Sequence, residues 1–173
     1  MTMLHNLVNK KVPNFKGTCF YEDKVQNLDL YQFKGNSILL LLFYPADFTS
    51  TCSSEIIAIS SLAKTLSSKN TKVMLVSTDS VFCHEAFNKT LDISIPYPMV
   101  SDVTKQISRM YNVLDESNGM CTRAHYLIDA HNIASVCNAQ SFGRSTTEII
   151  RQVDAINHMH RTGEKCLCNW SKE

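Results

Sequence analysis

Cysteine is the residue type in this sequence with the widest choice of chemistry. The chain has 173 residues and 7 cysteines, which are Cys19, Cys52, Cys83, Cys121, Cys137, Cys166 and Cys168. The count is odd, and several of the cysteines lie in apolar, strand-like surroundings, which does not fit the disulfide framework of a small secreted protein. In a reducing compartment such cysteines either fill the core or carry redox or metal chemistry.

Cys52 has the setting of a reactive cysteine. It ends the segment FYPADFTSTC, which leads from a buried strand into an amphipathic helix. Pro45 stops the strand, and Ser50 and Thr51 are good capping residues, so we expect Cys52 in the first helical turn. Free backbone N–H groups and the positive end of the helix dipole favour the thiolate there, which is the nucleophilic form. Most free cysteines are buried and inert, but the polar flank favours chemistry here.

The elements that must position this segment alternate between strands and helices. The pattern predicts strands over 18–30 around a turn at 22–24, and over 37–43, 73–76, 126–128 and 133–137, the last two joined by a turn at 129–132. It predicts helices over 52–67 and 80–89, and a third that opens at the capping box Ser145–Glu148. Residues Ile56, Ile59, Leu62, Ala63 and Leu66 form one buried stripe, and Ile149, Val153 and Ile156 form another.

This order predicts an α/β fold with a central mixed sheet flanked by helices, of which the thioredoxin-like fold is one example. We expect one domain over residues 1–161 and a short polar tail over 162–173.

Composition excludes several classes of function. The formal net charge is +1 and charged residues are 19% of the chain, so nucleic acid is not an expected partner. The longest apolar run, Ile38 to Phe43, is too short to span a membrane. Residues 1–11 lack the apolar stretch of a secretory signal. The sequence predicts a cytoplasmic protein, with an organelle as the open alternative.

The segment around Cys52 resembles the active-site signature of the two-cysteine peroxiredoxins. Pro45, Thr49 and Cys52 occupy the positions of its proline, threonine and peroxide-attacking cysteine. The likeness continues in blocks at 12–15, 77–84, 101–102, 107–114, 119–123, 143–145 and 163–166, and so spans nearly the whole chain. It implies a thioredoxin-like fold and a thiol-dependent peroxidase that reduces hydrogen peroxide and organic hydroperoxides.

The resemblance assigns roles around the sulfur. Cys52 would attack one peroxide oxygen and become a sulfenic acid. Thr49 would hydrogen-bond the peroxide, Pro45 would shield the pocket, and Arg123 would hold the thiolate and polarise the O–O bond. Supporting positions are Glu55 and Arg144, which would orient Arg123, and Tyr44. The remaining cysteines Cys19, Cys83, Cys121 and Cys137 would be packing residues, and His84 a structural histidine.

The resemblance also implies how the sulfenic acid is resolved. Cys166, from the tail of the partner subunit of a homodimer, would form a disulfide with Cys52, and a thioredoxin-type dithiol would reduce it. Cys168 could compete for this role, but Cys166 aligns with the family order of Gly163 and Trp170. Dimers of this family often assemble into decamers. The chemistry requires no metal, haem or flavin.

Other interpretations remain open. One is a one-cysteine mechanism in which an external thiol resolves Cys52. Another is a ring-forming, chaperone-like scaffold controlled by redox state. A thioredoxin-like reductase is disfavoured because the chain has no Cys-x-x-Cys pair. A metal site in the tail is also disfavoured, because the spacing of its candidate ligands fits no common zinc pattern; these ligands are His158, His160, Cys166 and Cys168.

The sequence departs from the family at several positions. Ser53 replaces a common proline and Phe87 a common tryptophan. The stretch 90–96 is short and lacks a Gly-Gly-Leu-Gly segment, and the sequence ends soon after Trp170 without a helix that carries a Tyr-Phe pair. In the family, those last two features slow resolution and expose the sulfenic acid to overoxidation.

We therefore predict that this protein resists inactivation by excess peroxide, because the disulfide forms before a second peroxide can reach the sulfenic acid. Mass spectrometry of the Cys52 peptide after turnover at rising peroxide concentration measures this. Accumulation of Cys52 sulfinic acid at low peroxide would contradict the prediction.

Overall fold

The computed structural model describes residues 7–130, 132–139 and 142–172. The start of the N-terminal segment, and one residue of the turn predicted at 129–132, lie outside the described residues.

The centre of the molecule is a mixed sheet of seven strands in the order β2-β1-β5-β4-β3-β8-β9. β3 runs parallel to β4 and antiparallel to β8, so it is an interior strand of the sheet. The strands are β1 (Lys16–Tyr21), β2 (Lys24–Asp29), β3 (Ile38–Phe43), β4 (Thr71–Ser77), β5 (Met99–Ser101), β8 (Arg123–Asp129) and β9 (Asn132–Ala139). Two further short strands, β6 (Leu114–Asp115) and β7 (Met120–Cys121), pair with each other.

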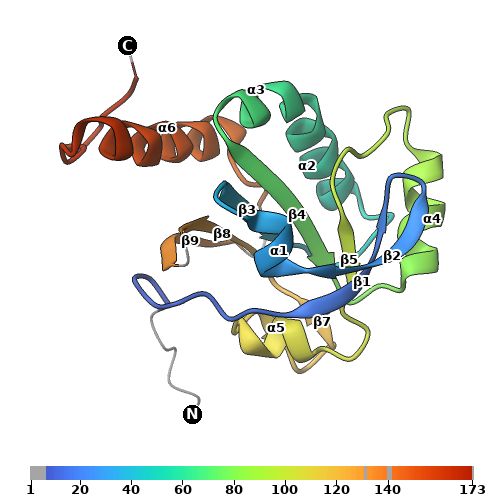
Figure 1. Ribbon diagram of the computed structural model, residues 1–173. Helices are drawn as coiled ribbons and strands as arrows, with labels where there is room; N and C mark the ends of the chain where they lie inside the picture. The colour runs from blue at the N-terminus through green and yellow to red at the C-terminus, as the bar shows by residue number, and fades with distance from the viewer. Residues whose placement is uncertain (1–6, 131, 140–141, 173) are drawn as a thin grey trace.

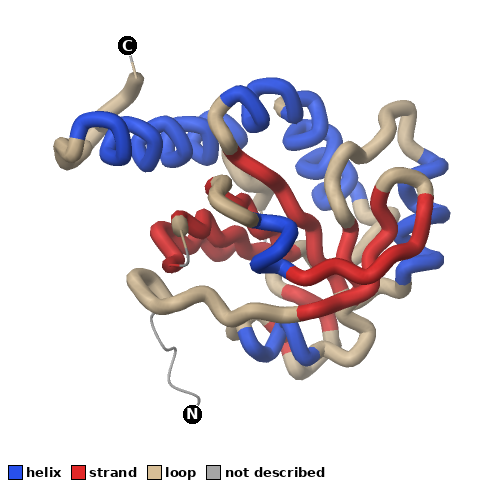
Figure 2. The backbone as a smooth tube through the Cα atoms, viewed as in Figure 1, coloured by secondary structure: helices blue, strands red, loops and turns tan. Residues whose placement is uncertain are grey.

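Helices cover both faces of this sheet, and each face has its own apolar core. In Figures 1 and 2, α2 and α3 lie above the sheet, α5 lies below it, and α6 projects to the left. The helices are α1 (Leu30–Lys34), α2 (Ser50–Ser61), α3 (Ala63–Ser68), α4 (Val81–Thr90), α5 (Gln106–Met110) and α6 (Thr146–Thr162). The predicted α/β class with a central mixed sheet is confirmed.

Strand β3 is buried along its whole length, as its unbroken apolar run predicts. Its side chains alternate between the faces: Leu41 and Phe43 enter one core, and Leu40 and Leu42 enter the other. The second core also contains Cys52, on α2. The strand therefore delivers the chain to the sheet edge from which the helix carrying Cys52 begins.

The helix predicted over 52–67 is wrong in its bounds. It begins at Ser50, with Thr49 as N-cap, and ends before Leu62, which caps both α2 and the following α3. The early start follows from Phe48, whose φ of 60° turns the chain before the extended Thr49. At Leu62 the amide bonds the Ile59 carbonyl at 3.1 Å, a tightened turn that breaks the α-helical ladder. The predicted buried stripe nevertheless faces the core.

The other predicted elements are confirmed within a few residues. The turn between β1 and β2 has Glu22 and Asp23 at positive φ. Ser145 caps α6 by accepting the Glu148 amide, as the capping box predicts. The strands β8 and β9 are longer than predicted, and their register contains a bulge between Leu127 and Ile128. The short elements α1, α5, β5, β6 and β7 had not been predicted.

His125 is an unusual core residue on β8. It is 3% exposed, and neither ring nitrogen has a hydrogen-bond partner among the described residues. Burial, followed by the positive charge of Arg144, lowers its pKa from 6.5 to about 4. The folded protein therefore holds a neutral imidazole where the unfolded chain would bind a proton.

No helix in the described ranges is long and apolar enough to cross a membrane.

We predict that acid destabilises the fold through His125. Its pKa in the folded state, about 4, lies below the unfolded value of 6.5, so the unfolded state binds more protons between these values and stability falls as the pH drops through this window. The loss by pH 4 is about 3 kcal/mol. Urea unfolding from pH 7 to pH 4 measures it, and His125→Leu should show a correspondingly smaller loss. Equal losses in both proteins would contradict the prediction.

Candidate active site

The Cys52 sulfur lies in the first turn of α2, as predicted, and the residue is only 1% exposed. The first main-chain bond of the helix runs from the Ser53 amide to the Thr49 carbonyl at 2.9 Å. The amides of Ser50, Thr51 and Cys52 precede it and have no acceptor within the helix. The positive end of the helix dipole therefore lies beside the sulfur.

Arg123 reaches Cys52 from the sheet. It begins β8, which pairs with β3 in a register that sets Ala124 opposite Phe43. Because side chains alternate along a strand and Ala124 faces the opposite core, Arg123 faces α2. Its Nη1 is 3.5 Å from Cys52 Sγ. Burial opposes the charge of Arg123, but its hydrogen bond to Cys52 and the nearby Glu55 carboxylate raise its pKa above the usual value.

Glu55 joins the two arginines of the site. Arg123 Nη1 donates to its Oε2 at 2.5 Å, and Arg144 Nη2 donates to the same oxygen at 2.8 Å. The Arg144 main-chain amide and Nε donate to Oε1 at 2.6 and 3.0 Å. Burial alone would raise the pKa of Glu55, but the hydrogen bonds and charge of Arg144 lower it. The carboxylate is thus held ionised, and the prediction that Glu55 orients Arg123 agrees with this contact.

Arg144 ties the site to the backbone. Its Nη1 donates to the carbonyl oxygens of Phe43 and Ala124 at 3.0 and 2.7 Å, at the ends of β3 and β8. The bonds of Arg144 go to Glu55 and to the two strand ends and not to Arg123 itself, and its predicted role in orienting Arg123 agrees with these contacts.

Without a charge on the Cys52 sulfur, the cluster of Arg123, Arg144 and Glu55 has an excess of one positive charge. Arg123 and Arg144 supply two positive charges, and Glu55 supplies one negative charge; their side chains are 6%, 4% and 6% exposed. A Cys52 thiolate restores the balance in a place that water does not reach. Arg123 Nε is also buried with no partner among the described residues, so a donor remains for another ligand.

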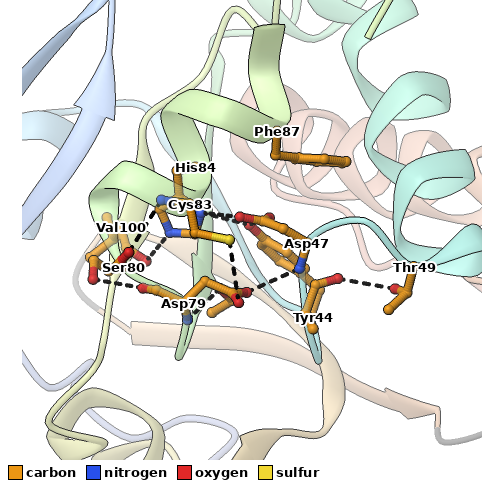
Figure 3. A network of polar contacts seen from close by, with 12 residues as sticks. Tyr44, Asp47, Thr49, Asp79, Ser80, Cys83, His84, Phe87 and Val100 are labelled. Carbon is orange, nitrogen blue, oxygen red and sulfur yellow. Dashed lines mark hydrogen bonds and ion pairs between the residues drawn. The ribbon is translucent and has the colours of Figure 1, made fainter. Parts of the chain in front are cut away.

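A buried network fixes the loop before α2 (Figure 3). Tyr44 Oη donates to Asp47 Oδ1 at 2.8 Å, and His84 Nδ1 lies 2.8 Å from Asp47 Oδ2. His84 Nε2 lies 3.3 Å from the Val100 carbonyl oxygen. Burial and the charge of Asp47 raise the pKa of Tyr44 well above its usual value, so Tyr44 acts as a neutral donor. The supporting position of Tyr44 and the structural role of His84 agree with these contacts, whereas Asp47 had not been singled out.

The same network includes Asp79 and Cys83. Asp79 accepts the Asp47 amide at 3.0 Å and the Ser77 hydroxyl at 2.7 Å, and Cys83 Sγ approaches it at 3.8 Å. Ligand atoms of Asp47, Asp79 and Cys83 lie within 4.8 Å of one another. The side chains of Asp47, Asp79 and Cys83 are already engaged in these contacts with protein groups. The tail residues considered as metal ligands do not form a cluster within the described part of the chain.

Thr49 and Pro45 belong to the loop that leads from β3 into α2, just before Cys52. Thr49 is exposed, and its hydroxyl donates to the Ala46 carbonyl at 3.0 Å instead of capping α2. The oxygen retains lone pairs that can accept a further hydrogen bond. Pro45 is half-buried between the buried Tyr44 and the loop.

Cys166 is not brought to Cys52 within one chain. It is half-buried, and its Sγ lies 3.7 Å from the Ala155 carbonyl oxygen of α6. The tail after α6 lies at the left of Figure 1, whereas α2 lies to the right of the centre. All 7 cysteines are free, and Cys168 is exposed.

Three of the other cysteines have the character of packing residues. Burial raises the pKa of Cys19 to about 11 and that of Cys121 to about 12. Burial and the charges of Asp47 and Asp79 raise that of Cys83 to about 12. Thiols in these environments stay protonated and unreactive.

Comparisons with known proteins agree with this geometry. The AhpC/TSA family model matches residues 8–136. The chain is 37% identical to alkyl hydroperoxide reductase C of Buchnera aphidicola subsp. Acyrthosiphon pisum over 175 positions, which cover 96% of this chain and 89% of that protein. It is 38% identical to the mitochondrial thioredoxin-dependent peroxide reductase of Mus musculus, over 96% of this chain and 67% of that protein.

Among solved structures, the reduced 2-Cys peroxiredoxin of Plasmodium vivax superposes with a TM-score of 0.91 at 35% identity, covering 96% of this chain and 90% of that one. This match confirms the thioredoxin-like fold. The resemblance seen around Cys52 is confirmed as well, and the chain belongs to the AhpC/TSA family.

Proposed function

We propose that this protein is a thiol-dependent peroxidase that reduces hydrogen peroxide and organic hydroperoxides. The observation that carries the proposal is the 3.5 Å contact between Arg123 Nη1 and Cys52 Sγ at the start of a helix. A fixed guanidinium and free helix amides favour the thiolate, which is the nucleophilic form of cysteine. The names of the Buchnera and mouse relatives support the same reaction class.

In the first step, the Cys52 thiolate attacks one oxygen of the peroxide in line with the O–O bond. The sulfur becomes a sulfenic acid, and the second oxygen leaves as hydroxide or alkoxide, which a proton converts to water or alcohol. Arg123 Nε, a buried donor without a partner among the described residues, supplies a hydrogen bond for the developing charge. The exposed Thr49 hydroxyl orients the incoming peroxide, and Pro45 limits the access of water.

In the second step, the sulfenic acid condenses with Cys166 of a partner subunit and releases water. Cys52 is 1% exposed, so the first turn of α2 must unwind before the two sulfurs can meet. The N-cap Thr49 makes no side-chain capping bond, which makes this unwinding easier by roughly 1 kcal/mol. Residues 1–161 then form the peroxidase domain, and residues 162–173 form the tail that delivers the resolving thiol.

We further propose a thioredoxin-type dithiol as the reductant and a homodimer, able to assemble into decamers, as the working form. The mouse relative is named as thioredoxin-dependent, which supports the first point. The separation of Cys166 from α2 in one chain supports the second. The cytoplasm is the proposed compartment.

We predict that Arg123→Met lowers the second-order rate constant for hydrogen peroxide about 100-fold, because the transition-state charge loses its fixed donor. The rate constant is measured by following the consumption of peroxide in a stopped-flow instrument, and Cys52→Ser should show no rapid phase of consumption. The matched control is Arg109→Met, which removes an exposed guanidinium paired with Glu116 and should leave the rate unchanged. A Cys52→Ser protein that consumes peroxide at the wild-type rate would overturn the function.

A second prediction tests the partner in trans. Mixed Cys52→Ser and Cys166→Ser chains should give a covalent dimer on non-reducing electrophoresis after peroxide treatment, because one chain supplies each sulfur. Cys166→Ser alone should give none. A covalent dimer that persists in Cys166→Ser would point to Cys168 as the resolving thiol, and loss of the dimer with turnover intact would favour an external thiol.

A further inference from the structure

Two thiols of the tail and one guanidinium of α6 line a single cavity. Arg151 of α6, Cys166 and Cys168 line this open cavity of about 920 Å³, together with Lys165. Cys166 is half-buried and Cys168 is exposed. The proposed resolution step uses only one of these thiols, so the second thiol and the arginine have no role in it.

The guanidinium of Arg151 is held in place from both sides. Its Nε and Nη2 donate to the two carboxylate oxygens of Glu148 at 2.7 and 2.8 Å, and its Nη1 donates to the Trp170 carbonyl at 3.1 Å. The bonds to Glu148 are the main cause of a raised Arg151 pKa, and the charges of Cys166 and Cys168 act in the same direction. Arg151 therefore ties the tail to α6 and lies within electrostatic reach of both sulfurs.

The spacing of the two cysteines allows a disulfide between them. Residues 164–167 have no helical or strand structure, and Cys168 begins a turn at 168–169. Where such a segment is extended, side chains two residues apart point to the same side. Two extended residues span at most about 7 Å, close to the upper limit of about 6.8 Å between the Cα atoms of a disulfide. Leu167 between them is 80% exposed, so a small bend meets little obstruction.

We propose, on the basis of the proposed peroxidase function, that Cys168 is a further catalytic thiol that takes over the disulfide formed by Cys52. The Cys168 thiolate attacks the Cys166 sulfur of the intersubunit disulfide. An S–S bond forms between Cys166 and Cys168, the bond to Cys52 breaks, and Cys52 leaves as a thiolate. The proton of the Cys168 thiol passes to solvent, and no net oxidation or reduction occurs.

The surroundings favour this direction. The departing Cys52 thiolate returns to Arg123 and the helix terminus, and a stabilised thiolate is the better leaving group. Arg151 lies beside the attacking thiol and is its positioning residue. The exchange frees Cys52 for another peroxide and leaves the oxidised pair on the exposed tail, where a dithiol reductant can reach it.

The test treats the protein with one equivalent of hydrogen peroxide per chain, without reductant. In the wild type, a covalent dimer should form and then decay to monomer, with Cys52 again open to alkylation. The tryptic peptide 166–172 should be lighter by two hydrogens. In Cys168→Ser the covalent dimer should persist. A wild-type dimer that persists equally, without the linked tail peptide, would overturn the proposal.

The role of Arg151 is tested by the rate at which the covalent dimer decays to monomer. Arg151→Met should slow the decay of the covalent dimer roughly tenfold, and the deficit should narrow at higher pH, where thiols ionise without a cation. Arg151→Lys should recover part of the rate. Arg161→Met, a matched change on the same helix beside a different cavity, should have no effect. Equal decay in all four proteins would remove Arg151 from the mechanism.

The two proposals fail in different ways. If the peroxidase function is wrong, neither the wild type nor Cys168→Ser consumes peroxide or forms a covalent dimer. If only the disulfide transfer is wrong, both proteins consume the peroxide and both stop at the covalent dimer.

Discussion

The site depends on one buried carboxylate. Glu55 follows Cys52 by three residues on α2, so both side chains lie on the same face of the helix. It accepts hydrogen bonds from Arg123 and Arg144 at once. Arg144 in turn bonds the last carbonyl of β3 and a carbonyl near the start of β8. A single anion therefore joins the helix that carries the sulfur to the strand that carries the guanidinium.

The contacts of Glu55 hold the site in one arrangement, whereas the proposed reaction also requires Cys52 to move. In the proposed mechanism, the Cys52 sulfur reacts with peroxide while it is buried and charge-balanced, and it must then leave that place to meet a second thiol. Contacts that hold the site and residues that can move occupy different positions along the chain. Tyr44, Asp47 and His84 fix the loop that precedes α2, and Glu55 fixes the helix one turn later. Only the uncapped first turn lies between them, so movement is confined to the residues that carry the sulfur.

The sequence predicts the elements whose patterns are long or carry turn chemistry. The apolar run of β3 and the capping box at Ser145 are both found in the structure. The start of α2 was predicted too late, because the chain turns at Phe48, where side-chain type carries little signal. The pairing of Arg123 with Cys52 spans 71 residues, and no spacing rule reaches across the sheet register that creates it. The resemblance to a family supplied that pair, whereas Asp47 and Asp79 were missed because single acidic residues in loops are common.

In the β8–β9 ladder Leu127 pairs with Ser135 and Ile128 pairs with Ile133, so the extra residue of the bulge lies on β9. The hairpin connection lies on one side of it, and Arg123 lies at the other end of the strand. A bulge takes up a residue of slippage without passing it along the ladder. The face of Arg123 is set by the unbroken pairing of β8 with β3, so a change of length at the β8–β9 connection that the bulge takes up would not turn the guanidinium away from α2.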